Sequence, residues 1–132
     1  PILDMHTING DVTIDGAGGP VTLTPFEVNH GAIEALGFRI GDLAYLPDVA
    51  HIPDDVWPVL EGLECWILDA LRRTPHPTHS HLEQSLEWIA RVAPRHAVLT
   101  NMHIDLDYQT VADETPDHVI PAYDGMTLTY KV

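Results

Sequence analysis

The sequence predicts an α/β fold, in which helices pack on a β-sheet to form one domain. Two observations support this: β-rich segments alternate along the chain with shorter segments whose apolar residues show helical spacing. A third is size, since 132 residues with 45% hydrophobic content supply one modest core. No internal repeat or low-complexity linker divides the chain, so we expect a single layered unit.

The first half of the chain is predicted to consist mainly of strands. We expect them in residues 11–14, 21–30, 33–40 and 43–48. The run DGAGGP predicts a turn after the first of these strands, and Gly41-Asp42 predicts a tight turn before the last. Pro53 and Asp54 suit the start of a short helix in the segment PDDVWPVLEGL.

The second half is predicted to alternate between strands and helices. We expect strands in residues 64–71 and 96–103, two short strands around Asp124-Gly125, and helices in residues 81–93 and 107–116. The longer helix places Leu82, Leu86, Ile89 and Val92 on one apolar stripe. Just before that stripe, the S-x-x-E pattern that begins at Ser80 predicts a capping box.

Charge and cysteine content restrict the partners and the compartment. The formal net charge of −14 argues against a nucleic-acid backbone or an anionic membrane as the main partner. The single cysteine, Cys65, excludes an internal disulfide and fits a reducing compartment. We see no signal peptide or membrane span, and therefore expect a cytoplasmic protein.

Polar side chains follow four of the predicted strands at the point where each strand ends. They are His30, Asp48, Asp69, and Asn101 with the nearby His103. Ligands bind at the carboxyl ends of strands in open α/β sheets, and histidine with aspartate suits zinc, manganese or iron. A single such residue more often has a structural role, but because four strand ends agree, we weigh a functional role and a structural role equally.

The ordered motifs FEVNHG, LAYLPDVA, CWILDAL, HPTHSHLEQSLE and AVLTNMHIDLDY resemble a known family. They are similar to the C-terminal half of the metallo-β-lactamase fold, and most of all to phosphoribosyl cyclic phosphodiesterases of the carbon–phosphorus lyase pathway. The resemblance runs from about residue 20 to the end of the chain. It implies half of an αββα sandwich, a mixed sheet with helices packed on it, and a hydrolytic site with two divalent metal ions.

The resemblance also implies roles for particular residues. It makes His30 a metal ligand, Asp48 the carboxylate that bridges both metals, and His79 a catalytic residue rather than a ligand. The family's late histidine ligand follows an LT pair, but Asn101 occupies that position here, so we expect His103 to be the ligand instead. The second imidazole nitrogen of His103 needs an acceptor, for which Asp105 and Asp107 are the nearby candidates.

The histidine-rich segment TPHPTHSHLEQ is predicted to bind phosphate. With Ser80 as N-cap, His79 lies at a helix N-terminus, which favours anions and suits a general acid or phosphate donor. His76, which is stiffened by two flanking prolines, is expected to be a second phosphate contact. Arg73 lies on the same approach and is expected to bind an anionic substrate, although a solvated surface charge is at least as common an explanation.

The family's signature H-x-H-x-D-H is absent from this sequence. The segment THSHLEQ mimics its spacing, but Gln84 replaces the last histidine and the segment follows the NHG and PDVA motifs instead of preceding them. We therefore expect residues 1–132 to be the C-terminal portion of a longer hydrolase, inactive or nearly so alone. The surfaces exposed by a missing half predict a tight homodimer or a partner chain.

Three functions are consistent with these observations. The first is a metal-dependent phosphodiesterase that acts on a small, cyclic or open phosphate ester. The second keeps the fold but cleaves a thioester, a lactone or a tRNA 3′ end; the acidic composition argues against tRNA, because phosphate contacts need lysine and arginine. The third is a non-catalytic acidic α/β binding or assembly domain whose histidines bind adventitious metal.

Overall fold

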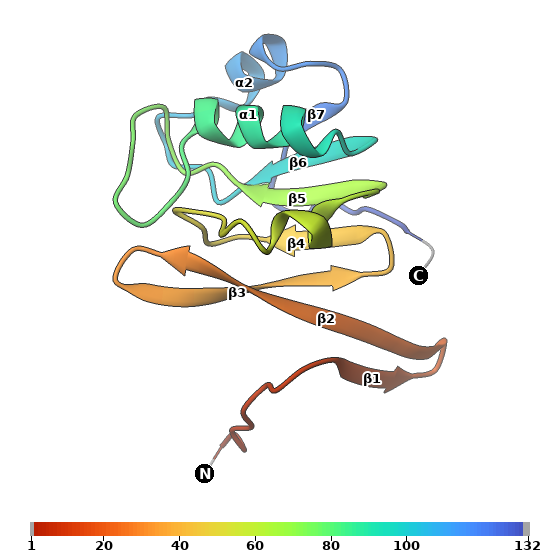
Figure 1. Cartoon of the computed structure of the whole chain (residues 1–132). Coiled ribbons are helices and arrows are strands. Elements are labelled where there is room, and N and C mark those ends of the chain that lie inside the picture. The colour runs from red at the N-terminus through yellow and green to blue at the C-terminus, as the bar shows by residue number, and fades with distance from the viewer. Residues whose placement is uncertain (1, 131–132) are drawn as a thin grey trace.

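The computed structural model describes residues 2–130, which form a seven-stranded mixed sheet with helices packed on it (Figure 1). The strands are β1 (Val12–Gly16), β2 (Gly19–His30), β3 (Ile33–Ile40), β4 (Leu43–Leu46), β5 (Cys65–Asp69), β6 (His96–Thr100) and β7 (Val119–Pro121). The helices are the 3₁₀ helix η1 (Trp57–Leu60), α1 (Leu82–Val92) and α2 (Tyr108–Glu114). The α/β prediction is confirmed. No helix in this described part of the chain is long and apolar enough to cross a membrane.

The strands follow chain order across the sheet, from β1 to β7. Neighbours from β1 to β4 are antiparallel, whereas β4 to β7 are parallel. Because β2 and β4 both run antiparallel to β3, the strands β2, β4, β5 and β6 point in the same direction. Their carboxyl ends therefore meet at one edge, on the left in Figure 1.

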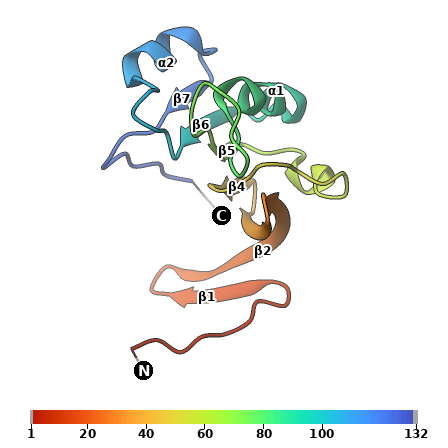
Figure 2. The same ribbon diagram turned by 90° about the vertical axis from the view of Figure 1, so that its left-hand side faces the viewer.

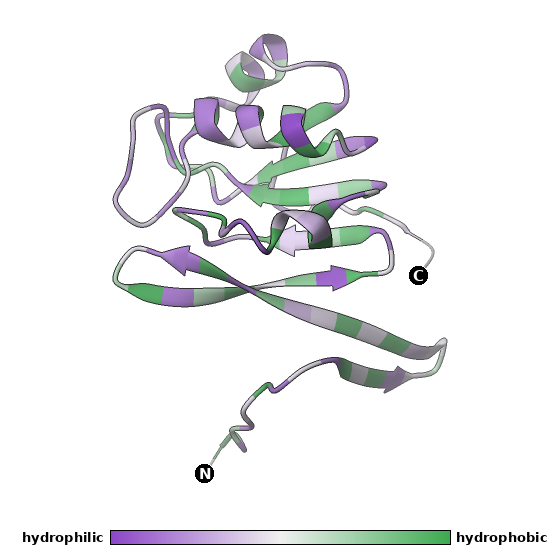
Figure 3. Cartoon of the chain, in the orientation of Figure 1, coloured by the Kyte–Doolittle hydropathy of each residue, from purple (hydrophilic) through white to green (hydrophobic). Residues whose placement is uncertain are grey.

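Figures 1 and 2 show α1 over the central strands, with α2 beyond it beside β7 at one end of the sheet. Ile89 of α1 and Val111 of α2 belong to the same hydrophobic core. On the α1 face, which η1 also covers, the core includes the fully buried Leu46, Leu60, Trp66 and Leu68 together with Ile89 of α1. Leu82 of the predicted helical stripe is also buried, and Leu86 and Val92 pack partly buried against this core. Figure 3 shows the result, with largely hydrophobic central strands beneath a helix whose outer side is mostly hydrophilic.

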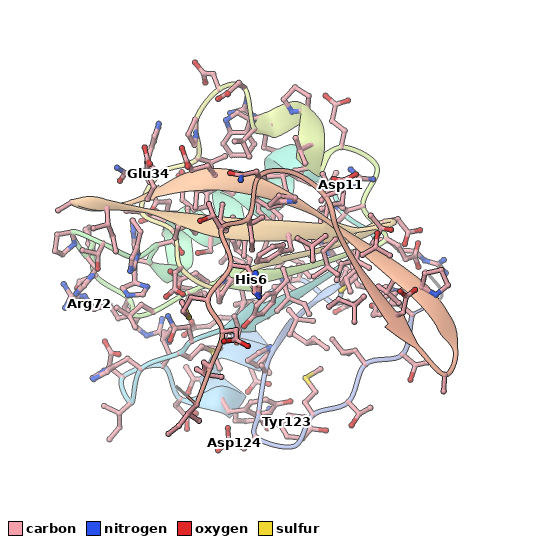
Figure 4. The ribbon with its side chains drawn as sticks, turned by 90° about the horizontal axis from the view of Figure 1, so that it is seen from below. His6, Asp11, Glu34, Arg72, Tyr123 and Asp124 are labelled. Atoms are coloured by element: carbon pink, nitrogen blue, oxygen red, sulfur yellow. The ribbon has the colours of Figure 1, made fainter. Side chains whose placement is uncertain are left out.

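The β1–β2 hairpin projects beyond the helical layers at the far end of the sheet (Figures 1 and 2). Almost all of β1 is exposed, and its Ile14 side chain lies open to solvent. The segment before it, with His6 and Asp11, runs across this end of the molecule (Figure 4). Apolar side chains at this end therefore lack a covering layer within the described residues.

Two sequence predictions about local structure are wrong. The N-cap of α1 is His81, without a side-chain cap, because the Ser80 hydroxyl is buried and donates to the Asp69 carbonyl oxygen at 2.7 Å. A serine hydroxyl can bond to either partner, and here the strand carbonyl takes it. The segment around Asp124-Gly125 forms a turn, with the Tyr123 carbonyl accepting from Met126 N–H, and no strand follows it up to residue 130. The prediction for residues 131 and 132 lies outside the described residues.

Candidate metal centre

Three side chains that come from separate parts of the chain meet at the carboxyl edge of the sheet. His30 ends β2, Asp48 follows β4, and His79 lies in the loop between β5 and α1. Each offers one ligand atom, and these atoms all lie within 4.8 Å of one another. Two imidazole nitrogens and a carboxylate oxygen are ligands that zinc, manganese and iron accept. The donor set therefore fits a divalent metal ion.

A backbone contact orients His30. Its Nδ1 lies 2.5 Å from the carbonyl oxygen of Thr78, in the histidine loop (residues 74–81). Because a carbonyl oxygen only accepts, Nδ1 carries the proton and the Nε2 lone pair remains for a metal ion. The ring also packs edge-on against His79, with ring centroids 4.6 Å apart. The sequence places His30 at a strand end, but only the fold supplies this partner from 48 residues away.

A buried carboxylate orients His79. The His79 Nδ1 lies 2.8 Å from Oδ2 of Asp69, whose side chain is 0% exposed. This contact places the proton on Nδ1 and leaves Nε2 for the site, as in the aspartate–histidine pairs of hydrolases. Asp48 also lies near this nitrogen, with its Oδ1 3.8 Å from His79 Nδ1.

Asp69 receives its hydrogen bonds from neutral groups as well as from His79. Its Oδ2 accepts from Val49 N–H at 3.2 Å, and its Oδ1 accepts from the Asn101 amide at 3.2 Å. Burial raises the pKa of the Asp69 carboxyl, and the hydrogen bonds from His79, Val49 and Asn101 oppose that rise. The sequence places Asp69 at a strand end but assigns it no role. The sequence feature that could have indicated a role is an acidic residue at the end of an otherwise apolar strand.

Asn101 links the loops instead of binding metal in this arrangement. Its backbone has a positive φ of 60°, a conformation that asparagine tolerates better than most residues. Its amide nitrogen donates to Asp69 Oδ1 and also to the Pro47 carbonyl oxygen at 3.3 Å. Asn101 thus connects the residue before Asp48 with the carboxylate that orients His79.

His103 does not join the group formed by His30, Asp48 and His79. Its side chain is 60% exposed, and its Nδ1 lies 3.1 Å from Oδ1 of Asp105, one of its two predicted acceptors. Asp107 instead caps α2 by accepting from Thr110 N–H at 2.9 Å, and these bonds lower the pKa of its carboxyl. The assignment of His103 as a metal ligand stays a prediction.

The other predicted substrate contacts are His76, inside the histidine loop, and Arg73, just before it. The His76 ring centroid is 5.4 Å from that of His79, so the structure does bring these two predicted contacts together. Partial desolvation and the neighbouring charges of Arg72 and His79 lower the pKa of His76. Arg72 donates to the carbonyl oxygens of Thr74 and Pro75, which holds the loop closed at the edge seen in Figure 4.

Arg73 points away from this group. Its guanidinium forms a bidentate pair with Glu114 of α2, at 2.8 and 3.2 Å. This pair raises the pKa of Arg73 and occupies the nitrogens that a substrate anion would need. A substrate contact through Arg73 stays a prediction, and it requires this pair to open.

The fold and the histidine–aspartate group define a protein of the metallo-β-lactamase fold, as the sequence motifs predict. The chain belongs to the family described as the beta-lactamase superfamily domain, whose model matches residues 1–104. The match therefore begins before the segment that carries the recognised motifs.

Solved structures agree with this assignment. A diphosphatase from the PhnP family is 33% identical to the chain, with a TM-score of 0.91 over 98% of this chain and 50% of that one. Zinc-bound PqqB from Methylobacterium extorquens is 20% identical, with a TM-score of 0.67 over 95% of this chain and 55% of that one. The chain thus spans about half the length of these relatives.

One curated relative carries a different name. An octanoyltransferase from Porphyromonas gingivalis (strain ATCC BAA-308 / W83) is 28% identical over 129 residues, which are 96% of this chain and 26% of that protein. The chain spans only about a quarter of that relative, so the shared part need not carry the named activity.

Proposed function

We propose that this protein is a metal-dependent hydrolase that cleaves a small, cyclic or open phosphate ester. The observation that carries the proposal is the convergence of His30, Asp48 and His79 within 4.8 Å at the carboxyl edge of the sheet. The similarity to a PhnP-family diphosphatase supports a phosphate ester as the substrate class. The recognised family implies two metal ions in the complete site.

His30 and Asp48 would hold the metal. His30 offers Nε2, because its Nδ1 is engaged by Thr78. The Asp48 carboxylate is half-exposed and has two oxygens, which suits the predicted bridge between two cations. When bound, divalent metal would lower the pKa of a coordinated water and polarise a phosphoryl oxygen.

His79 is proposed to act on the substrate rather than on the metal. Asp69 holds its Nδ1–H, so Nε2 remains available to a substrate. A protonated Nε2 can donate to a phosphoryl oxygen or protonate the leaving alkoxide, and the Asp69 carboxylate stabilises the imidazolium during that step. His76, beside it in the same loop, would be a second phosphate contact.

Measurements of metal affinity and of hydrolysis rate distinguish the metal ligands from the residue that acts on the substrate. Replacing Asp48 or His30 with alanine should weaken zinc or manganese affinity at least about tenfold by calorimetry, because each removes one ligand. Replacing His79 should leave that affinity within a few-fold, yet lower phosphodiester hydrolysis by the full-length protein by about 10²–10⁴. Full metal-dependent activity in Asp48→Ala would refute the mechanism.

The same measurements test the other functions. If His79→Ala abolishes metal binding as completely as Asp48→Ala does, His79 is a third ligand and the proposed general acid is wrong. If the full-length protein binds metal but hydrolyses no phosphate ester, thioesters and lactones are the next substrates to assay. If it hydrolyses none of these, the acidic binding or assembly domain is the better interpretation.

A further inference from the structure

We propose that the flank of α1 next to Arg73 docks a cationic amphipathic helix from a partner polypeptide. A groove of about 520 Å³ runs along this flank, here called the α1 groove, and it is lined by Arg73, Leu82, Glu83, Leu86, Glu87 and Ala90. None of these side chains belongs to the candidate metal centre. The proposal is therefore independent of the proposed hydrolase activity.

The floor of the α1 groove is apolar and has helical spacing. Leu82, Leu86 and Ala90 are four residues apart, so they lie in one row along α1 that is about 12 Å long. The small Ala90 side chain leaves room at one end of the row. Such a row accepts the apolar side chains of a second helix between its ridges.

The rim of the α1 groove is acidic and uncompensated along the helix. Glu83 and Glu87 are exposed and four residues apart, an arrangement in which like charges destabilise an isolated helix. Arg91 is four residues after Glu87, but its guanidinium carbon lies 3.7 Å from the ring centroid of Trp57. A partner that supplies cations would relieve the repulsion between the two glutamates.

The described part of this chain has no cation to supply. Every arginine there is engaged: Arg39 and Arg72 with backbone carbonyls, Arg73 with Glu114, Arg91 with Trp57, and Arg95 with Glu64. A second copy docked about a two-fold axis would also bring Glu83 and Glu87 against the same glutamates. The charges therefore favour a different, positively charged polypeptide over a second copy.

The partner's chemistry follows from the row and its rim. It would present leucine-like side chains three or four residues apart to Leu86 and Ala90, with lysine or arginine beside them to meet Glu83 and Glu87. The same acidic rim disfavours an anionic membrane surface.

A synthetic helical peptide of about 18 residues, with a leucine stripe flanked by lysines, is the probe. We expect it to bind the 132-residue chain, and the Glu83→Lys/Glu87→Lys variant to bind it at least about tenfold more weakly by fluorescence anisotropy. Asp11→Lys/Asp15→Lys is the matched control, because it changes the net charge equally at the distant β1 hairpin (Figures 1 and 4). That variant should bind within about twofold of the wild type.

A second variant tests the groove itself. Ala90→Trp fills the end of the row without changing charge, and it should also weaken binding about tenfold. Thermal unfolding followed by circular dichroism verifies that each variant is folded. Equal losses in both charge variants would show attraction to net charge alone and overturn the proposal, as would unchanged binding in a folded Ala90→Trp variant.

Discussion

Asp69 shows how one buried carboxylate organises the candidate site. It is fully buried, contacts His79 at 2.8 Å, and accepts further bonds from Val49 and Asn101. No arginine or lysine is among these partners, so the buried carboxylate is stabilised only by neutral hydrogen-bond donors and an imidazole. The arrangement gives His79 a defined proton position at the expense of stability.

The stability cost of Asp69 has a predictable pH dependence. Because burial raises its pKa in the folded protein, its contribution to stability is fully present below the unfolded value of about 3.9 and is lost as the pH rises through the folded value. In metal-free protein, the free energy of unfolding of wild type minus that of Asp69→Asn should therefore fall with increasing pH. Urea denaturation from about pH 4 to 8 measures this difference.

The same substitution on an exposed carboxylate, Asp54→Asn, controls for general charge effects. The free energy of unfolding of the wild type minus that of Asp69→Asn could instead rise with pH. That result would mean that the hydrogen bonds from His79, Val49 and Asn101 outweigh the effect of burial on the Asp69 pKa.

Asp69→Asn should also affect catalysis more than metal affinity. An asparagine no longer stabilises the His79 imidazolium, so phosphodiester hydrolysis by the full-length protein should fall by two or more orders of magnitude, about as for other such pairs. Metal affinity should change little, because neither proposed ligand, His30 or Asp48, hydrogen-bonds to Asp69. Equal losses in rate and affinity would instead indicate that Asp69 maintains the fold of the whole site.

At the scale of elements, the histidine loop is positioned by its contact with the β2–β3 turn. Gly31 lies in this turn with φ +79°, and a Cβ there would come within 2.6 Å of Thr78 Cγ2 and 3.2 Å of the Pro77 carbonyl oxygen. The neighbouring His30 bonds to the Thr78 carbonyl. In Figure 4, Glu34 of β3 and Arg72, which precedes the loop, lie at the same edge of the molecule, in agreement with this contact.

Gly31→Ala should therefore displace the histidine loop. We expect lower thermal stability and metal affinity weakened at least several-fold, because the loop can no longer hold His30 and His79 in their present positions. Gly62→Ala is the matched control, since Gly62 also has a positive φ, +68°, but open space around its added Cβ. The control should cost only the backbone strain, about 1 kcal/mol, and leave metal affinity unchanged. Equal effects in the two variants would show that the contact with Thr78 is unimportant.

At the scale of the whole molecule, β1 and β3 leave three large apolar side chains exposed. Ile14 is 56% exposed, Ile33 64% and Leu36 38%, and β1 is the terminal strand of the sheet. An exposed apolar strand edge favours association with another chain. The predicted homodimer, which stays a proposal, would bury these residues.

The proposed dimer can be tested by light scattering after size-exclusion chromatography. The 132-residue chain should elute as a dimer at micromolar concentration, and Ile14→Lys/Leu36→Lys should convert it to a monomer, because a charged side chain at these exposed apolar positions opposes their burial against a second copy. Gln109→Lys, on the exposed side of α2, controls for the added charge and should remain dimeric. A wild-type chain that elutes as a monomer would contradict the prediction.

Much of the architecture is determined by the sequence itself. Apolar runs such as CWILDA specify buried parallel strands, alternating runs specify the hairpins, and the order of strands places His30, Asp48, Asp69 and Asn101 at one edge. These features depend on the spacing of apolar residues and on the direction of each strand, and both follow from residues that are close together in the sequence. The acidic charge is likewise a property of composition alone.

Only the tertiary structure decided which of the polar residues meet. His79 joins His30 and Asp48 whereas His103 does not, Asp69 becomes the partner of His79, and Ser80 bonds to a strand instead of capping a helix. The direction of each of these side chains depends on a contact with a distant segment, such as the one between His30 and Thr78. Sequence spacing carries no information about such contacts, because they form only when the loops pack together at the edge of the sheet.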